Sequence, residues 1–164
     1  MTGLPALIRE RGSVLVQRLA TQGVTLPEAV QGTLAGLADR RALDRLQRER
    51  RQKVAEVVFA YYVAILDHPL AYWTPAREQV LCNLLALAHD DPNLLLYAID
   101  GVSRDAWALG EHPRNQRRLE SFTWLFEDGG IDRLERYAET QKGYKLEKPH
   151  PLIIKHALPT GEAV

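Results

Sequence analysis

Residues 39–66 read DRRALDRLQRERRQKVAEVVFAYYVAIL, and this stretch decides the fold class. Its apolar side chains recur at intervals near three and four residues, the spacing of one face of an α-helix. They are Ala42, Leu46, Val54, Val57, Val58, Tyr61 and Ile65. The first half is rich in charge and the second half is apolar, so we expect one long helix whose second half enters a core. Asp67-His68-Pro69 ends the pattern, because the residue before a proline avoids helical geometry.

Upstream of this stretch, local signals predict two shorter helices. Thr25-Leu-Pro-Glu28 is a capping-box pattern, in which the hydroxyl and the carboxylate each bind a free backbone N–H. The helix that it opens is expected to end near Leu37. An earlier helix is expected over 13–22, where Gly23 ends it.

Downstream, the same kinds of signal predict a series of helices. Thr74-Pro75 begins one that reaches about Ala88, and Asp91-Pro92 begins another that ends at Gly101, where glycine is free to take the left-handed cap conformation. Shorter helices are expected over 119–126 and 131–140. No strand pair or repeat is found, so we predict an all-α fold, a compact helical bundle with a long charged helix and an irregular C-terminal tail.

The predicted organisation has three parts. Residues 1–57 form an N-terminal helical arm that includes the basic helix, and residues 58–141 form a helical domain. Residues 142–164 contain Pro149, Pro151 and Pro159 and are expected to be extended or disordered. Within that tail, 152–154 could dock as a short strand or clip.

Composition excludes several classes of protein. The chain has 164 residues, of which 46% are apolar, and 21 basic side chains balance 21 acidic ones, so attraction of the whole molecule to nucleic acid is not expected. Cys82 is the only cysteine, which excludes an internal disulfide and a zinc site built on several thiolates. No signal peptide or membrane-spanning run of about 18 apolar residues is found, so we expect a cytoplasmic protein with no membrane partner.

No pattern of residues predicts catalysis. The five histidines form no metal-binding motif and are expected to face solvent or to cap helices. Cys82 lies among leucines and valines and is expected to fill core space. No phosphate-binding glycine loop or nucleophile elbow is present. We therefore predict a protein that is not an enzyme, with no catalytic residues, metal site or cofactor.

The strongest local feature is a basic run at 40–53. Its seven cations are offset only by Asp44 and Glu49, which leaves a local charge of about +5. Arg41, Arg45 and Arg48 share one helical face and could follow a phosphate backbone. Two other interpretations stay open, a plain solvated helix and an interface to an acidic partner. Ala42, Leu43 and Leu46 would also allow the 39–66 helix to pair with a second copy.

A second cluster, Arg114, Arg117 and Arg118, lies between Trp107 and Trp124. Arginines near tryptophans can bind single-stranded nucleic acid: the cations contact its backbone while its bases stack on the aromatic rings. They also commonly cover tryptophan faces in a hydrophobic body. The predicted nucleic-acid or partner-binding residues are therefore Arg41, Arg45, Arg48, Arg51, Lys53, Arg114, Arg117 and Arg118.

The stretch 58–138 contains an ordered series of short motifs: Tyr61-Tyr62, Thr74-Pro75-Ala76-Arg77, Ala98-Ile99-Asp100-Gly101, Asp105-Ala106-Trp107, Leu109-Gly110-Glu111, Leu119, Phe122, Leu125-Phe126, Asp128 and Ile131 to Tyr137. In the order and spacing of these motifs, it resembles the C-terminal helical domain of phage and prophage replication-initiation proteins, also called replisome organisers. The usual upstream winged-helix domain has no counterpart here, and the loop after Trp107 differs at His112-Pro113.

The resemblance implies a replication accessory protein of a phage or other mobile element. Its expected partners are DNA, possibly single-stranded, and a replicative helicase or its loader. The alternative is a protein-interaction module without nucleic-acid binding, such as an inhibitor of a host enzyme or a structural subunit. In both cases Trp107, Phe122, Trp124 and Phe126 are expected to anchor the core.

Overall fold

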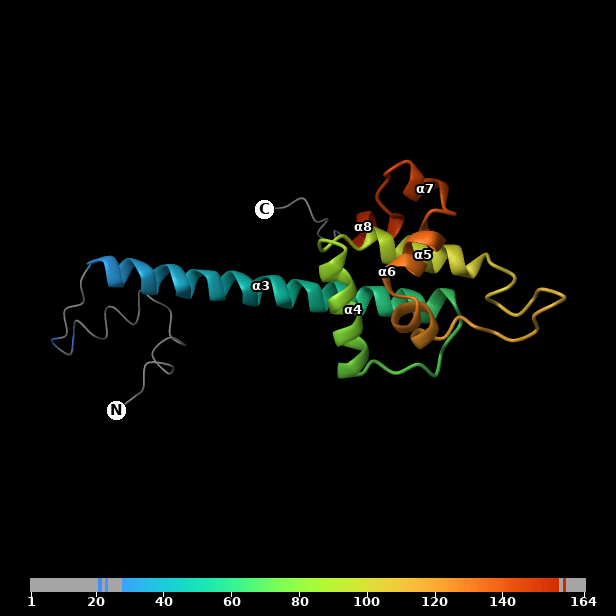
Figure 1. Ribbon diagram of the computed structural model, residues 1–164, viewed down its shortest axis with the longest axis horizontal. Helices are drawn as coiled ribbons and strands as arrows, with labels where there is room; N and C mark the ends of the chain where they lie inside the picture. The colour runs from blue at the N-terminus through green and yellow to red at the C-terminus, as the bar shows by residue number, and fades with distance from the viewer. Residues whose placement is uncertain (1–20, 22, 24–27, 157, 159–164) are drawn as a thin grey trace. The chain divides into compact units, whose positions relative to one another are not determined.

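The computed structural model describes residues 21, 23, 28–156 and 158, and this part of the chain is helical, which confirms the all-α prediction. The elements are α3 (Glu28–Ile65), α4 (Pro75–Leu87), α5 (Asn93–Ser103), the π-helix η1 (Thr123–Asp128), α6 (Gly130–Ala138), α7 (Lys142–Lys145) and α8 (Pro151–His156) (Figure 1). β-pairing in the described residues is limited to an isolated bridge between His112 and Asn115. Apart from Thr21, the helix expected over 13–22 lies outside the described residues, as does the cap at Thr25.

Helix α3 is longer than the sequence predicts, because the break expected between Leu37 and Asp39 is absent. No proline interrupts this region, and Leu37-Ala38 are good helix formers that let the helix continue. Gly36 lies inside the helix, and a Cβ placed there would meet no atom within 4 Å. The prediction of two separate helices was therefore wrong.

The chain divides after Arg50 into two compact units, Met1–Arg50 and Arg51–Val164, and α3 contributes to both. We call residues 51–158 the body and residues 40–50 the basic segment. The body begins earlier than the predicted boundary at residue 58, because Val54 and Ala55 are already buried.

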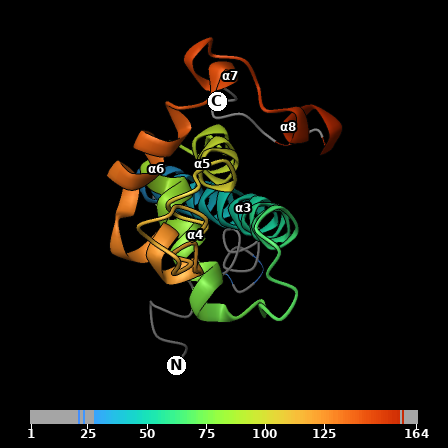
Figure 2. The same ribbon diagram turned by 90° about the vertical axis from the view of Figure 1, so that its right-hand side faces the viewer.

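The core of the body centres on α5, whose six consecutive residues 94–99 are all buried. A helix that is apolar on every side must be covered on several sides. Helices α3, α4, η1 and α6 supply the cover; Figure 2 shows them around α5. The predicted anchors Phe122 and Phe126 are buried in this core.

The expected start of α4 is confirmed, whereas α5 begins one residue later than expected, with Pro92 at the N-cap position and not in the first turn. The Thr74 hydroxyl accepts a hydrogen bond from the Arg77 N–H at 3.3 Å, and Pro75 occupies the first turn, where a missing donor does no harm. Before α5, the Asp91 carboxylate accepts from the Asn93 N–H at 2.9 Å. Local chemistry therefore fixes where both helices begin.

Gly101 does not end α5 as a left-handed cap. The helix continues to Ser103, and Gly101 is buried against the last turn of α6. A Cβ at this position would collide with the carbonyl oxygen of Tyr137 and lie 2.9 Å from its carbonyl carbon. The glycine is thus required by the close approach of two helices and not by a turn.

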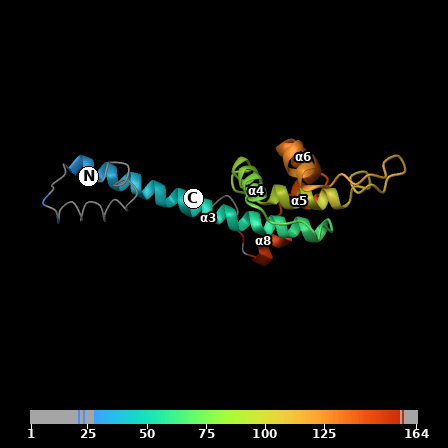
Figure 3. The same ribbon diagram turned by 90° about the horizontal axis from the view of Figure 1, so that it is seen from below.

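The C-terminal segment differs from the predicted extended or disordered tail. Helices α7 and α8 form within it, and Ile153 is buried in the core. Figure 3 shows α8 beside α3, on the side away from α4 and α6. The prediction followed the prolines, but Pro151 sits in the first turn of α8, where proline is compatible with a helix. The 152–154 stretch does dock, as a helix and not as a strand.

Candidate nucleic-acid interface

All five arginines of the basic segment are exposed. They are Arg40, Arg41, Arg45, Arg48 and Arg50. Leu43 and Leu46 lie between them and are 61% and 49% exposed, so this part of α3 has no apolar cover from the described residues. The guanidinium groups of Arg40, Arg45, Arg48 and Arg50 are accessible to an anionic ligand. The same surface would equally suit an interface to an acidic partner.

Arg51 differs from its neighbours because it belongs to the body. Its guanidinium donates two hydrogen bonds to the Asp90 carboxylate, from Nε to Oδ1 at 2.6 Å and from Nη2 to Oδ2 at 2.9 Å. The hydrogen bond with Asp90 raises the pKa of Arg51 above its usual range. This bidentate pair joins α3 to the end of α4. Arg51 was predicted to bind a ligand, but it has a structural role, whereas Lys53 is exposed as expected.

The second predicted cluster lies on the loop between α5 and η1, residues 104–121. Figures 1 and 3 show this loop, in yellow and orange, extending away from the helices of the body. Gly110 turns the chain with φ of +71°, and a Cβ there would lie 2.9 Å from the Arg118 backbone nitrogen. The Asn115 amide donates to the carbonyl oxygens of Trp107 at 2.7 Å and Arg117 at 3.1 Å. The two sides of the loop are therefore held together.

Arg118 also serves the fold. Its Nε donates to Oε1 of Glu120, a carboxylate only 1% exposed, and its Nη2 donates to the Leu66 carbonyl oxygen at 3.3 Å. A buried carboxylate needs such a partner, because desolvation of an unpaired charge is unfavourable by several kcal/mol. Arg118 thus has a structural role, although its side chain is 55% exposed, and Arg114 and Arg117 are exposed as well. Ligand binding by these three arginines stays a prediction.

The tryptophans of this region have different surroundings. Trp124 is half-buried, and the Arg133 guanidinium lies over its ring at 4.4 Å from the centroid. Trp107 is 46% exposed, so the prediction that it anchors the core was wrong. The nearest ring is that of His112, at 5.1 Å and inclined by 51°. An arginine does cover a tryptophan face here, but it comes from α6 and not from the 114–118 cluster.

A buried polar cluster escaped the sequence analysis. Asp100 accepts hydrogen bonds from the Tyr61 hydroxyl at 2.6 Å and from the His150 Nε2 at 2.8 Å. Burial alone would raise the pKa of Asp100, but these hydrogen bonds and the Arg104 charge outweigh burial and lower it. Asp100 is the only charged residue inside the apolar α5, and that isolation was the available signal.

This cluster has the residue types of a catalytic pair, but its geometry serves structure. The His150 Nδ1 accepts a hydrogen bond from the Leu152 N–H at 3.2 Å, so Nε2 carries the proton that is shared with Asp100. With both ring nitrogens engaged and the ring only 3% exposed, His150 cannot take a proton from a substrate. It caps α8, as expected of a histidine, but it is buried and does not face solvent.

The other residues that could form a reactive or metal-binding site lack the surroundings that such a site needs. Cys82 packs against the core, and burial raises the pKa of its thiol, which disfavours the reactive thiolate. In the described part of the chain, no three histidine, cysteine, aspartate or glutamate side chains come together as metal ligands. None of the helices there combines the length and apolar character needed to cross a bilayer.

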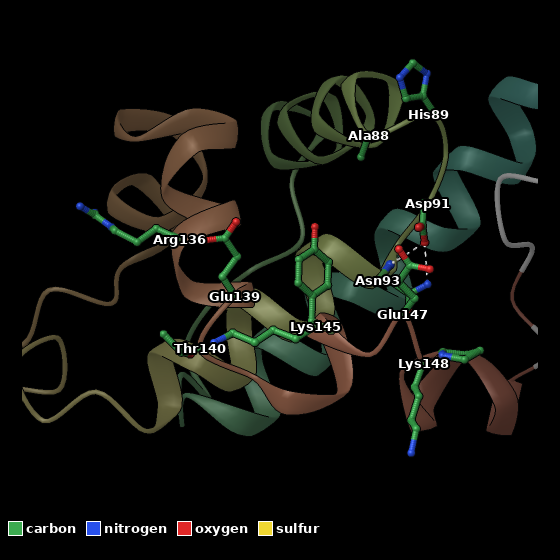
Figure 4. Close-up of a pocket in the computed structure, with 12 residues that line it drawn as sticks. Ala88, His89, Asp91, Asn93, Arg136, Glu139, Thr140, Lys145, Glu147 and Lys148 are labelled. Carbon is green, nitrogen blue, oxygen red and sulfur yellow. Dashed lines mark hydrogen bonds between the residues drawn. The ribbon is translucent and has the colours of Figure 1, made fainter.

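An open groove of about 1210 Å³ lies between the α4–α5 turn and α6–α7 (Figure 4). Its lining mixes both signs of charge: Arg136, Lys145 and Lys148 against Asp91, Glu139 and Glu147. Figure 4 shows Asp91 and Asn93 hydrogen-bonded to each other in its wall. Such a lining does not select a polyanion, and the groove is therefore not part of the candidate interface.

No family model, curated protein or solved structure matches this chain.

Proposed function

We propose that this protein is not an enzyme and binds nucleic acid through the exposed arginines of the basic segment. The observation that carries the proposal is the contrast within α3. Arg51 is bound to Asp90, whereas Arg48 and Arg45, about one and two turns earlier, have exposed side chains with no ion pair among the described residues. Exposed guanidinium groups on one helix can neutralise successive phosphates and release counterions.

A role in the replication of a phage or other mobile element extends this proposal. It is supported only by the resemblance of residues 58–138 to replication-initiation proteins. In that setting, a helicase or its loader would be the protein partner. The exposed Leu43 and Leu46 favour a second candidate function, pairing of this helix with another protein or with a second copy of the chain.

The test is binding of labelled duplex DNA, measured by fluorescence anisotropy over a series of salt concentrations. The triple variant Arg45→Ala, Arg48→Ala, Arg50→Ala should bind more weakly, and the slope of log affinity against log salt should fall by roughly 0.9 for each lost phosphate contact. Its melting temperature should not change, because these side chains are exposed.

The matched control removes the same charge from exposed lysines of the C-terminal segment: Lys142→Ala, Lys145→Ala, Lys155→Ala. This control should keep the wild-type salt slope. Equal losses in both triple variants would indicate attraction without a defined site. Absence of DNA binding by the wild type at low salt would reject the proposal. Self-association would be favoured instead if light scattering showed a molar mass that rises with protein concentration, and if Leu43→Glu abolished that rise.

A further inference from the structure

Among the tryptophans that the structure describes, Trp107 is the one whose indole face is not covered by a neighbouring side chain of the core. Trp73 packs against Phe59 with ring centroids 5.1 Å apart, and Trp124 lies under Arg133. Trp107 is nearly half exposed, and its tilted contact with His112 does not cover the indole face. A single exposed apolar side chain is ordinary on a protein surface, so a ligand at Trp107 is indicated by the hydrogen bonds and charges of its loop.

The loop holds the backbone that carries this indole in a defined place. The backbone N–H of Trp107 donates to Asp105 Oδ1 at 2.9 Å, and the Trp107 carbonyl oxygen accepts from the Asn115 amide. Further along, the Leu119 N–H donates to the Ala108 carbonyl oxygen at 2.8 Å. A ligand that meets the indole therefore encounters an ordered surface, and little ordering entropy is lost on binding.

The charge around the indole is favourable for phosphate. Arg114 and Arg117 are exposed. The loop has three acidic residues: Asp105 binds the Tyr137 hydroxyl, Glu120 is buried and binds Arg118, and Glu111 is exposed. Asn115 binds the carbonyl oxygens of both Trp107 and Arg117, so the indole and that arginine extend from backbone segments held by one amide. An aromatic face beside cations is the arrangement that proteins use to stack bases while contacting the phosphate backbone.

We infer that the 104–121 loop binds single-stranded nucleic acid, with a base stacked on Trp107 and phosphates contacted by Arg114 and Arg117. This inference rests on the proposed function, and it adds that the 104–121 loop prefers single-stranded to double-stranded nucleic acid. In a duplex the base faces are already stacked on one another, so only an unpaired base can use the indole. A protein-binding hot spot would need an apolar surround, and Trp107 is the only large apolar side chain exposed on the loop.

The experiment compares a labelled oligothymidylate single strand with a duplex of equal length, by anisotropy at low salt. Trp107→Ala should weaken binding of the single strand by roughly 5- to 150-fold and leave duplex binding by the basic segment unchanged. Trp107→Phe keeps a stacking face and should retain most of the affinity. Trp107→Leu keeps apolar bulk without that face and should behave like alanine.

A second readout is tryptophan fluorescence. The single strand should quench the wild-type signal, and Trp107→Phe should lose the quenching while it still binds. Wild-type single-strand affinity in both Trp107→Ala and Trp107→Leu would overturn the inference and leave the proposed function intact. Equal losses of affinity for the single strand and the duplex would also overturn the inference, because stacking on Trp107 would then not distinguish unpaired from paired bases. If the wild type binds neither probe, the proposed function fails first.

Discussion

The body and the basic segment contain the same type of side chain in opposite circumstances. In the body, four arginines bind other parts of the fold: Arg51 binds Asp90, Arg104 binds Gln141, Arg118 binds Glu120 and Arg133 covers Trp124. Arg114 and Arg117, on the 104–121 loop, are exposed. In the basic segment, Arg45 and Arg48 are exposed and have no ion pair among the described residues. Arginines that hold a fold together and arginines that are available to a ligand therefore look alike in the sequence, and only the partner on a distant element distinguishes them.

The largest difference should appear between Gly101 of the body and Gly36, a glycine of α3 that precedes the basic segment. Gly101→Ala inserts a methyl group against the Tyr137 backbone and should lower the free energy of unfolding by about 3 kcal/mol, because backbone cannot move aside as a side chain can. Gly36→Ala should instead raise helix stability by about 1 kcal/mol, because a Cβ there meets nothing. Urea denaturation and circular dichroism measure both effects. Equal effects at the two sites would contradict the close packing of α5 on α6.

The next effect concerns the buried cluster that attaches the C-terminal segment. Asp100→Asn removes a charged acceptor and should lower the free energy of unfolding by about 2 kcal/mol at neutral pH. Because folding lowers the pKa of Asp100, its contribution is complete above the ordinary value of 3.8 and is lost as the pH falls through the lowered pKa. The difference in the free energy of unfolding between the wild type and Asp100→Asn should therefore become smaller in acid. A difference that stays constant from neutral to strongly acidic pH would show that the carboxylate charge does not matter.

The smallest effect tests the contrast most directly. Arg51→Ala should destabilise the body by about 1 kcal/mol, since it breaks a part-exposed bidentate pair, and should leave nucleic-acid affinity unchanged. Arg48→Ala should change stability by less than about 0.5 kcal/mol and should weaken binding. Thermal melts measure the stability of the two variants, and fluorescence anisotropy measures their affinity for nucleic acid. If Arg51→Ala loses affinity without losing stability, the assignment of roles is reversed.

Local signals predicted the all-α class, the start of α4 and, to within one residue, the start of α5, because a cap and its helix are adjacent in the chain. They did not predict features that depend on distant partners. The role of Gly101 depends on Tyr137, and the pairing of Arg51 depends on Asp90. The exposure of Trp107 likewise depends on where its loop extends. For the candidate interface, the exposed side chains of Arg45 and Arg48 agree with the prediction, but ligand binding there stays a proposal.

The attachment of His150 to Asp100 has a consequence for synthesis of the protein. Ile153 and the His150 ring complete the packing against α3 and α5, so the body lacks part of its core until these residues have left the ribosome. Until then Tyr61 and Asp100 lack one partner of their cluster, and the apolar surface that Ile153 covers is open to water. We expect the nascent body to depend on protection from aggregation until α8 has left the ribosome, and its folding to finish after that point.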